Sequence, residues 1–239
     1  MLRLIDWPTG LQWTSREPLT GPRSVKSGSS ESVTGWVQTF GSPFGLWRWS
    51  YSFPPLRGAA FRAYRGMVVA LHGGANAVRV PFCDPDGLSW QAMGVDLSGL
   101  PGAGVPWSNG LPWSNGLPWQ LGRPTVAITI AAAKGESVVY LADERWGHRL
   151  GVGDMIGFAP FHFGVYFVTE IIEPGRYRIW PPLRRAVSTL DEATLEPVLA
   201  MRLESEGAAN AARGVAMAEN LTLTLVEIED VDVHEYFSD

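Results

Sequence analysis

Residues 46–53 constrain the fold more than any other part of this 239-residue chain. Aromatic side chains occupy every second position of the segment, at Trp47, Trp49, Tyr51 and Phe53. Because alternate side chains of a strand point to opposite faces, these four share one face of a predicted strand. The strand must end at Pro54 and Pro55, since neither proline can donate to a sheet ladder. Such a face needs a thick hydrophobic core or a partner subunit to cover it.

Residues 59–71 are predicted to form a helix. Their apolar side chains recur at three- and four-residue spacing, which gives one apolar stripe: Phe61, Tyr64, Met67, Val68 and Leu71. The Gly73-Gly74 pair that follows can adopt the left-handed backbone that ends a helix. A strand over residues 77–83 and a turn over residues 84–87 come next, the turn indicated by Asp, Pro and Gly.

The rest of the chain is typical of a mainly β protein. Residues 24–32 are polar and predict an exposed segment or an edge hairpin. Short strands about ten residues apart predict a small antiparallel barrel or sandwich; they cover residues 125–131, 137–142, 154–158, 164–172 and 176–180. Two further strands are predicted over residues 195–204 and 220–231. The predicted fold class is therefore mainly β (α+β).

Residues 104–121 contain a hexapeptide repeat in which proline precedes each of Trp107, Trp113 and Trp119. A period of six suits neither a helix nor a plain strand, so an ordered loop or a stack of tight turns is expected. Three interpretations stay open. The indoles could cover the adjacent barrel as a lid, dock a neighbouring subunit, or stack on sugar rings; tryptophan suits interfaces because it offers a large, rigid contact area.

Composition excludes several classes of protein. A net charge of −5 argues against nucleic acid as the main partner. The single cysteine, Cys83, excludes intrachain disulfides and multi-thiolate zinc sites. No stretch reaches the length of a membrane span, and the N-terminal residues lack the apolar core of a signal peptide. We expect a chain that is made, and assembled into something larger, in a reducing cytoplasm.

Signals for catalysis are weak. The histidines lie far apart in the sequence and lack the spacing of a helical zinc motif: His72, His148, His162 and His234. Asp84 and Asp86 flank Pro85, but a turn explains them. The segment 151–154 lacks the lysine of a phosphate-binding loop, and no nucleophile elbow is present. We therefore expect no enzyme activity, no cofactor and no metal site.

The order of several short motifs resembles the distal tail proteins of long-tailed phages and phage-like particles, in the form found in alphaproteobacteria. The motifs are Gly35-Trp36-Val37-Gln38, the aromatic strand, Pro54-Pro55-Leu56-Arg57, Phe61-Arg62-Ala63-Tyr64-Arg65, Gly73-Gly74, Asp84-Pro85, Gly153-Asp154, Val165-Tyr166-Phe167-Val168, Pro181-Pro182-Leu183-Arg184, Met201-Arg202-Leu203 and Val226-Glu227. They extend over most of the chain.

The resemblance implies a structural virion protein. Members of that family form a hexameric ring at the tail tip, between the tail tube protein and the hub or fibre proteins. Their core is a tail-tube-like β-sandwich with one flanking helix, into which a smaller domain is inserted. By this analogy residues 1–100 form the ring core, 101–122 the Pro-Trp loop, 123–194 an inserted small β domain, and 195–239 strands that return to the core.

The candidate site is then a set of surfaces. The candidate interface residues are Trp47, Trp49, Tyr51, Phe53, Trp107, Trp113 and Trp119. A carbohydrate-binding module that recognises the host envelope is the alternative function, which the row of tryptophans would support. A small hydrolase is a further rival, disfavoured because no catalytic set can be assembled from the sequence.

Overall fold

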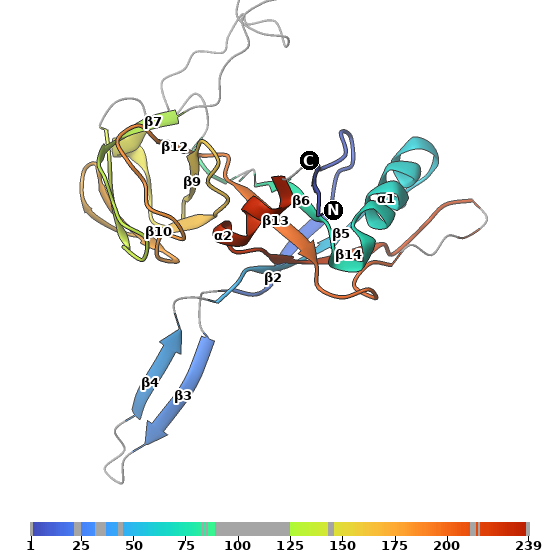
Figure 1. Ribbon diagram of the computed structural model, residues 1–239, viewed down its shortest axis with the longest axis horizontal. Helices are drawn as coiled ribbons and strands as arrows, with labels where there is room; N and C mark the ends of the chain where they lie inside the picture. Colours follow the sequence, from blue (N-terminus) through green and yellow to red (C-terminus); the bar gives the residue numbers. More distant parts are fainter. Residues whose placement is uncertain are drawn as a thin grey trace, which may run out of the picture.

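The computed structural model describes residues 2–21, 25–31, 37–42, 45–82, 84, 86–88, 125–142, 146–210, 214 and 216–237. They form a six-stranded sheet with one long helix, a closed six-stranded barrel, and a two-stranded hairpin, as Figure 1 shows. The predicted class, mainly β with one flanking helix and a small additional β domain, is confirmed. Among the described residues, no helix is long and apolar enough to cross a membrane.

The six-stranded sheet combines strands from both ends of the chain. Its order is β1 (Leu4–Asp6), β6 (Ala77–Pro81), β13 (Val198–Leu203), β14 (Thr222–Glu227), β5 (Arg48–Ser52) and β2 (Ser15–Thr20). Only the β1–β6 pair is parallel. The chain therefore leaves this sheet after β6 and returns to it at β13, and the barrel strands lie between.

The aromatic face of the predicted strand lies in the core of this sheet. The four side chains have exposed fractions of at most 5%: Trp47, Trp49, Tyr51 and Phe53. Helix α1 (Gly58–Ala70) packs its predicted stripe against them, with the Tyr64 and Phe53 ring centroids 5.0 Å apart. The Tyr64 hydroxyl also lies within hydrogen-bond distance of the Asn210 and Thr222 carbonyls, at 2.7 and 3.0 Å, so one helix residue contacts two distant segments.

The helix ends where the glycine pair predicted. A short 3-10 helix, η1 (His72–Gly74), follows α1, and Gly73 and Gly74 have φ angles of 66° and 102°. At Gly74 a side chain is also excluded by space, because a Cβ atom there would lie 2.7 Å from the Leu203 carbonyl oxygen. The close approach of the helix end to β13 therefore requires glycine. The predicted turn after β6 is also present, since Gly87 N–H donates to the Asp84 carbonyl.

The second unit is a closed barrel. Its strands are β7 (Thr125–Ile130), β8 (Val138–Leu141), β9 (Met155–Ala159), β10 (Tyr166–Glu173), β11 (Arg176–Trp180) and β12 (Glu192–Thr194), in the order β10-β11-β8-β7-β12-β9. The pairing of β9 with β10 closes the ring. Trp146 fills the interior, and the Tyr177 hydroxyl donates to the Gly147 carbonyl there. Five of the six strands were predicted; β12 has only three residues, too few to show alternation.

Two predicted strands differ from the structure by three residues or more at one end. The strand predicted over residues 220–231 ends at Glu227, and α2 (Asp230–Val233) and η3 (His234–Phe237) follow. The Glu229 carbonyl begins this turn of helix by accepting from the Asp232 N–H, and Val233 is buried in a cluster with Ala77 and Phe163. The strand predicted from residue 195 begins at Val198, after Pro197, which has no N–H to donate.

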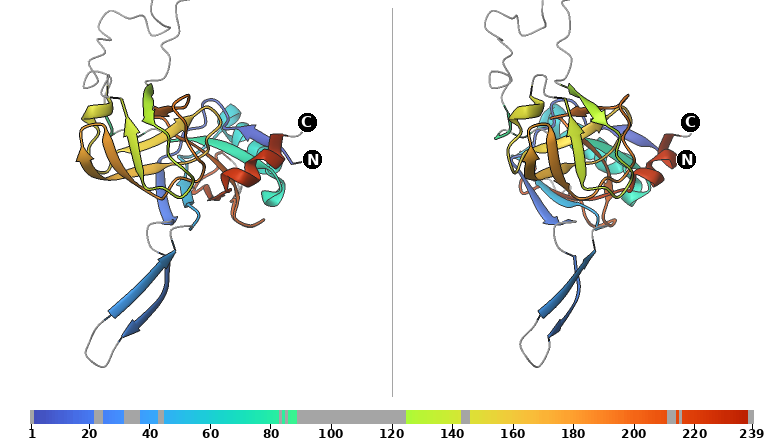
Figure 2. Two further views of the ribbon diagram at one scale, coloured as in Figure 1. Left: turned by 60° about the vertical axis from the view of Figure 1, so that its left-hand side comes forward. Right: turned by 90° about the vertical axis from the view of Figure 1, so that its left-hand side faces the viewer.

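The hairpin, β3 (Val25–Glu31) with β4 (Val37–Ser42), extends away from both units in every view (Figures 1 and 2). Its strands pair with each other and, among the described residues, with no other strand. We call this hairpin the arm. Of the two alternatives predicted for residues 24–32, an exposed segment or an edge hairpin, a hairpin is observed, but it is not paired to the edge of the six-stranded sheet.

Replacing Trp49 with alanine should lower the free energy of unfolding by about 3–5 kcal/mol, because a buried aromatic ring leaves a cavity behind. The Trp49 ring packs against Phe82, with centroids 5.1 Å apart, and lies under the Arg16 guanidinium. Urea denaturation measures the loss. The matched control is Leu190→Ala, since Leu190 is 90% exposed and should change stability by less than about 0.5 kcal/mol. Equal midpoints for both variants would contradict the assignment of Trp49 to the core.

Candidate functional site

The structure places the sequence-predicted interface residues in two classes. Trp47, Trp49, Tyr51 and Phe53 lie in the subunit's own core, so burial within the chain accounts for this aromatic face. Trp107, Trp113 and Trp119 lie outside the described residues, as does Cys83. The described part of the chain offers three other features: the joint between sheet and barrel, the arm, and a cavity.

We call the contact between the six-stranded sheet and the barrel the joint. Trp47 is part of the joint, because it belongs to the sheet core and contacts the barrel. Its indole Nε1 donates to the Val165 carbonyl at 3.3 Å, and its ring centroid lies 5.6 Å from that of Phe167. Its backbone N–H donates to a Glu227 carboxylate oxygen at 2.8 Å. Gly21 lies against the same indole, where a Cβ atom would come within 2.3 Å of Trp47 Cε3. Residues at the edge of the sheet and residues of the barrel therefore both contact the Trp47 side chain.

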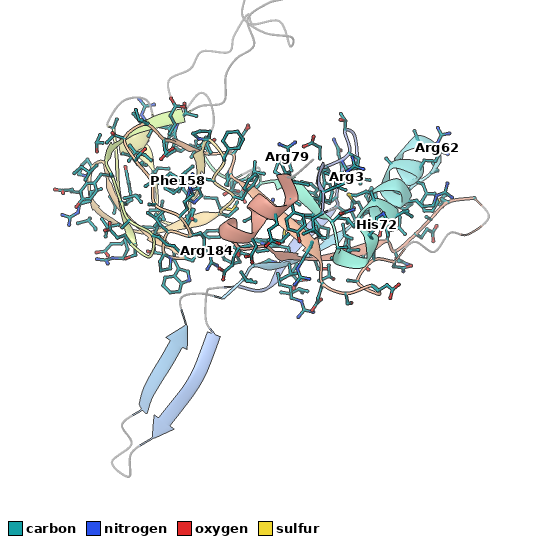
Figure 3. The ribbon with its side chains drawn as sticks, in the orientation of Figure 1. Arg3, Arg62, His72, Arg79, Phe158 and Arg184 are labelled. Carbon is teal, nitrogen blue, oxygen red and sulfur yellow. The ribbon has the colours of Figure 1, made fainter. Side chains whose placement is uncertain are left out.

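Arg184 supplies the barrel's half of the joint. It follows β11, its side chain is 6% exposed, and Figure 3 shows it at the border between the barrel and the sheet. One guanidinium nitrogen, Nη2, donates to the Glu227 carboxylate at 3.3 Å and to the Gly45 carbonyl. The Arg184 backbone N–H donates to the Tyr166 hydroxyl at 2.9 Å, and that hydroxyl lies 2.6 Å from His162 Nε2.

Glu227 completes the joint at the end of β14. Burial raises the pKa of its carboxyl group from 4.5 to about 7, because a charged carboxylate loses its hydration there. Arg184 and the Trp47 N–H oppose this rise, and Glu229 adds to it. A buried ion pair of this kind is costly to form, yet removing one partner leaves an uncompensated charge. The pair therefore makes the contact between the two units specific.

A cavity of about 590 Å³ lies between the sheet edge and the barrel. On the sheet side the Arg79 guanidinium forms an ion pair with Asp6 at 2.6 Å, beside Trp7. Phe158 and His162 line the barrel side; Figure 3 labels Arg79 and Phe158 on the two sides. The cavity therefore combines aromatic rings with charged groups of both signs, a lining suited to a small polar ligand.

Among the side chains that the structure describes, the candidate catalytic groups are not brought together. His72 is exposed at the end of α1, whereas His162 is buried in the barrel beside Tyr166; the side chains of His148 and His234 lie outside the described set. Among the side chains that the structure describes, no group of three or more His, Cys, Asp or Glu residues could hold a metal ion. Gly151 N–H donates to the Asp154 carboxylate at 2.7 Å, which is the geometry of a turn.

Sequence reasoning did not identify the joint as a site. Arg184 and Glu227 both occur in motifs that carry the family resemblance, but 43 residues separate them. No local pattern reports a contact between such distant positions. The available signal was that Glu227 continues the alternation of β14 on the face that buries Leu223 and Leu225.

Comparisons with known protein families and with curated protein sequences found no relative of this chain. No model of a known protein family matches the chain, and no curated protein sequence matches it.

Glu227→Gln should reduce the pH dependence of stability. The folded-state pKa of Glu227, about 7, exceeds the unfolded value of 4.5, so the folded protein binds the extra proton. The contribution of Glu227 to the free energy of unfolding is therefore full below pH 4.5 and is lost as the pH rises through 7. Between about pH 5 and 8 the wild type should lose about 2–3 kcal/mol of unfolding free energy through this group. The glutamine amide of the variant can still accept both hydrogen bonds but cannot ionise, so the variant should lack this component.

The measurement is urea denaturation at several pH values. Glu170→Gln is the control, because Glu170 is an exposed carboxylate, 54% accessible, paired with Arg178. This control should keep the wild-type slope. A Glu227→Gln slope equal to that of the wild type would show that Glu227 does not titrate in this range.

Proposed function

We propose that this chain is a structural virion protein, a distal tail ring that joins the tail tube to the tail-tip hub or fibre complex. The ring is a homo-oligomer, a hexamer by analogy with the family it resembles, located at the tail tip. The chain acts through surfaces and not through catalysis. The order of its motifs supports this proposal, as do its sheet with one flanking helix and its additional β barrel.

The arm is the observation that carries the proposal. A two-stranded hairpin in water is marginally stable by itself and usually needs a third strand or a packed face. Among the described residues the arm receives no third strand from its own chain. Its strands are mostly polar or small in sequence, with Val25, Val37 and Phe40 as the large apolar residues. A neighbouring copy of the chain that packs against the arm would supply the missing support.

The joint supports the same function by making the subunit one body. Met155 and Val165 of the barrel region belong to the hydrophobic cluster of the sheet, and the Trp47 indole bonds to Val165. A ring that connects a tube to a tip complex must hold its two faces in a fixed position relative to each other. A packed joint with a buried ion pair provides the stiffness that this role requires.

The alternative function is a carbohydrate-binding module for host recognition, and the cavity favours it. The Phe161 ring, which lines the cavity and is exposed, can stack on a sugar face, and Asp6 and Arg79 can bond to hydroxyl groups. Under this alternative the chain would work as a monomer and would be retained on glycans. Under the ring function it would form a large oligomer.

Replacing residues 25–42 with a short Gly-Ser turn should abolish assembly while the two β units stay folded. Light scattering coupled to size exclusion measures the mass, and circular dichroism checks the fold. The control is Val69→Ser, which removes a 66% exposed apolar side chain from α1 and should leave the oligomer intact.

Two results would contradict the proposal. An arm-deleted chain that assembles like the wild type would remove the arm from the interface. A wild-type chain that stays monomeric at all concentrations and binds glycans on an array would favour the carbohydrate-binding alternative.

A further inference from the structure

The arm leaves the body between two neighbouring strands of the sheet. β2 ends at Thr20 before β3 begins, and β4 ends at Ser42 before β5 begins at Arg48. On the body side of the arm, Gly21 lies against the Trp47 indole, too close for any side chain at position 21. The direction of the arm therefore depends on how residues 21 and 45–47 are held.

One of these residues is held by the barrel. The Gly45 carbonyl accepts a hydrogen bond from Arg184 Nη2, across 139 residues of sequence. The same nitrogen bonds to Glu227 of the sheet. A single guanidinium therefore contacts the base of the arm and the last residue of β14.

The backbone of Arg184 is fixed to the barrel on the other side. Leu183, the preceding residue, is 1% exposed in the barrel core, and its N–H donates to the Glu136 carbonyl at 2.8 Å. The Arg184 N–H donates to Tyr166, whose hydroxyl also bonds to His162. Arg184 cannot move without disturbing the barrel, so its position follows that of the barrel.

We infer that Arg184 is a positioning residue that couples the orientation of the barrel to the direction of the arm. A change in the barrel, such as contact with a neighbouring tail-tip protein, would reach the arm through the Arg184–Gly45 hydrogen bond. The inference that this coupling serves ring assembly rests on the proposed function. The inference that Arg184 couples the barrel to the arm within one chain is independent of the proposed function.

The planar guanidinium suits this role better than an ammonium group would. Both acceptors, Gly45 and Glu227, bond to Nη2, whose two N–H bonds are fixed in the guanidinium plane, so the acceptors are held at a set angle to each other. A lysine at this position would keep the positive charge, but its ammonium group rotates freely about its bond to the side chain. Arg184→Lys should therefore retain a hydrogen bond to Glu227 and loosen the arm.

The test measures distances between pairs of spin labels in the full-length chain, with Cys83 replaced by serine. One pair joins the arm to the barrel, at Ser29→Cys and Val152→Cys; the other joins the helix to the barrel, at Val69→Cys and Val152→Cys. Val69 and Val152 are 66% and 67% exposed, so labels there should not disturb packing. The measurement is made at about pH 6, below the Glu227 pKa of about 7, so that removing Arg184 leaves little buried charge.

Arg184→Met should shift and broaden the arm-to-barrel distance distribution relative to the wild type. Arg185→Met is the matched control, because Arg185 is the exposed neighbour and bonds to the Phe161 carbonyl, away from the arm. It should leave both distributions unchanged. If Arg184→Met does not fold, Arg184→Lys replaces it, and a broader arm-to-barrel distribution is still expected.

An arm-to-barrel distribution that is the same in the wild type and in the folded Arg184 variant would overturn the inference. The result is independent of ring formation, since it is read within one chain. If the wild type forms no ring but its arm depends on Arg184, the proposed function fails and the coupling stands. If rings form and the arm-to-barrel distribution is unchanged in the Arg184 variant, the coupling fails and the proposed function stands.

Discussion

The buried contact of Arg184 with Glu227, beside the Trp47 indole, is the interaction on which the arrangement of this protein depends. Beside it, Met155, Val165 and Phe167 of the barrel region pack against the core of the sheet. With it, the barrel, β14 and the base of the arm converge on one guanidinium. Removing one partner of such a pair typically costs about 3–5 kcal/mol, because the other is left charged in a dry environment. This cost selects one orientation of the two units over the alternatives.

The same contact suits the proposed function, in which the chain acts through its surfaces. The sheet and α1 form a rigid base, the barrel provides a second surface at a fixed angle, and the arm extends from their border (Figure 2). A subunit that connects two different neighbours needs separate surfaces held at constant geometry. Under the proposed function, the arm contacts an adjacent copy, and the barrel and sheet remain available to other tail components.

Local patterns predicted most strands and the helix after residue 45 but neither β1 nor β2, and they predicted long-range partners poorly. Strict alternation at Trp47–Phe53 and the spacing of Phe61, Tyr64 and Met67 identified a buried strand and its covering helix, because both signals lie within a few residues. The three-residue β12 carries no such signal, and the end of β14 depends on the buried Val233 turn that follows it. The joint could not be predicted, since it pairs a motif residue after β11 with a carboxylate 43 positions away.

Native mass spectrometry of the purified full-length chain tests the central claim, assembly into a ring, most directly. We predict one dominant closed oligomer, expected to be a hexamer, whose particles appear as rings by negative-stain microscopy. A chain that remains monomeric across the accessible concentration range, or that forms open polymers without a fixed copy number, would contradict it.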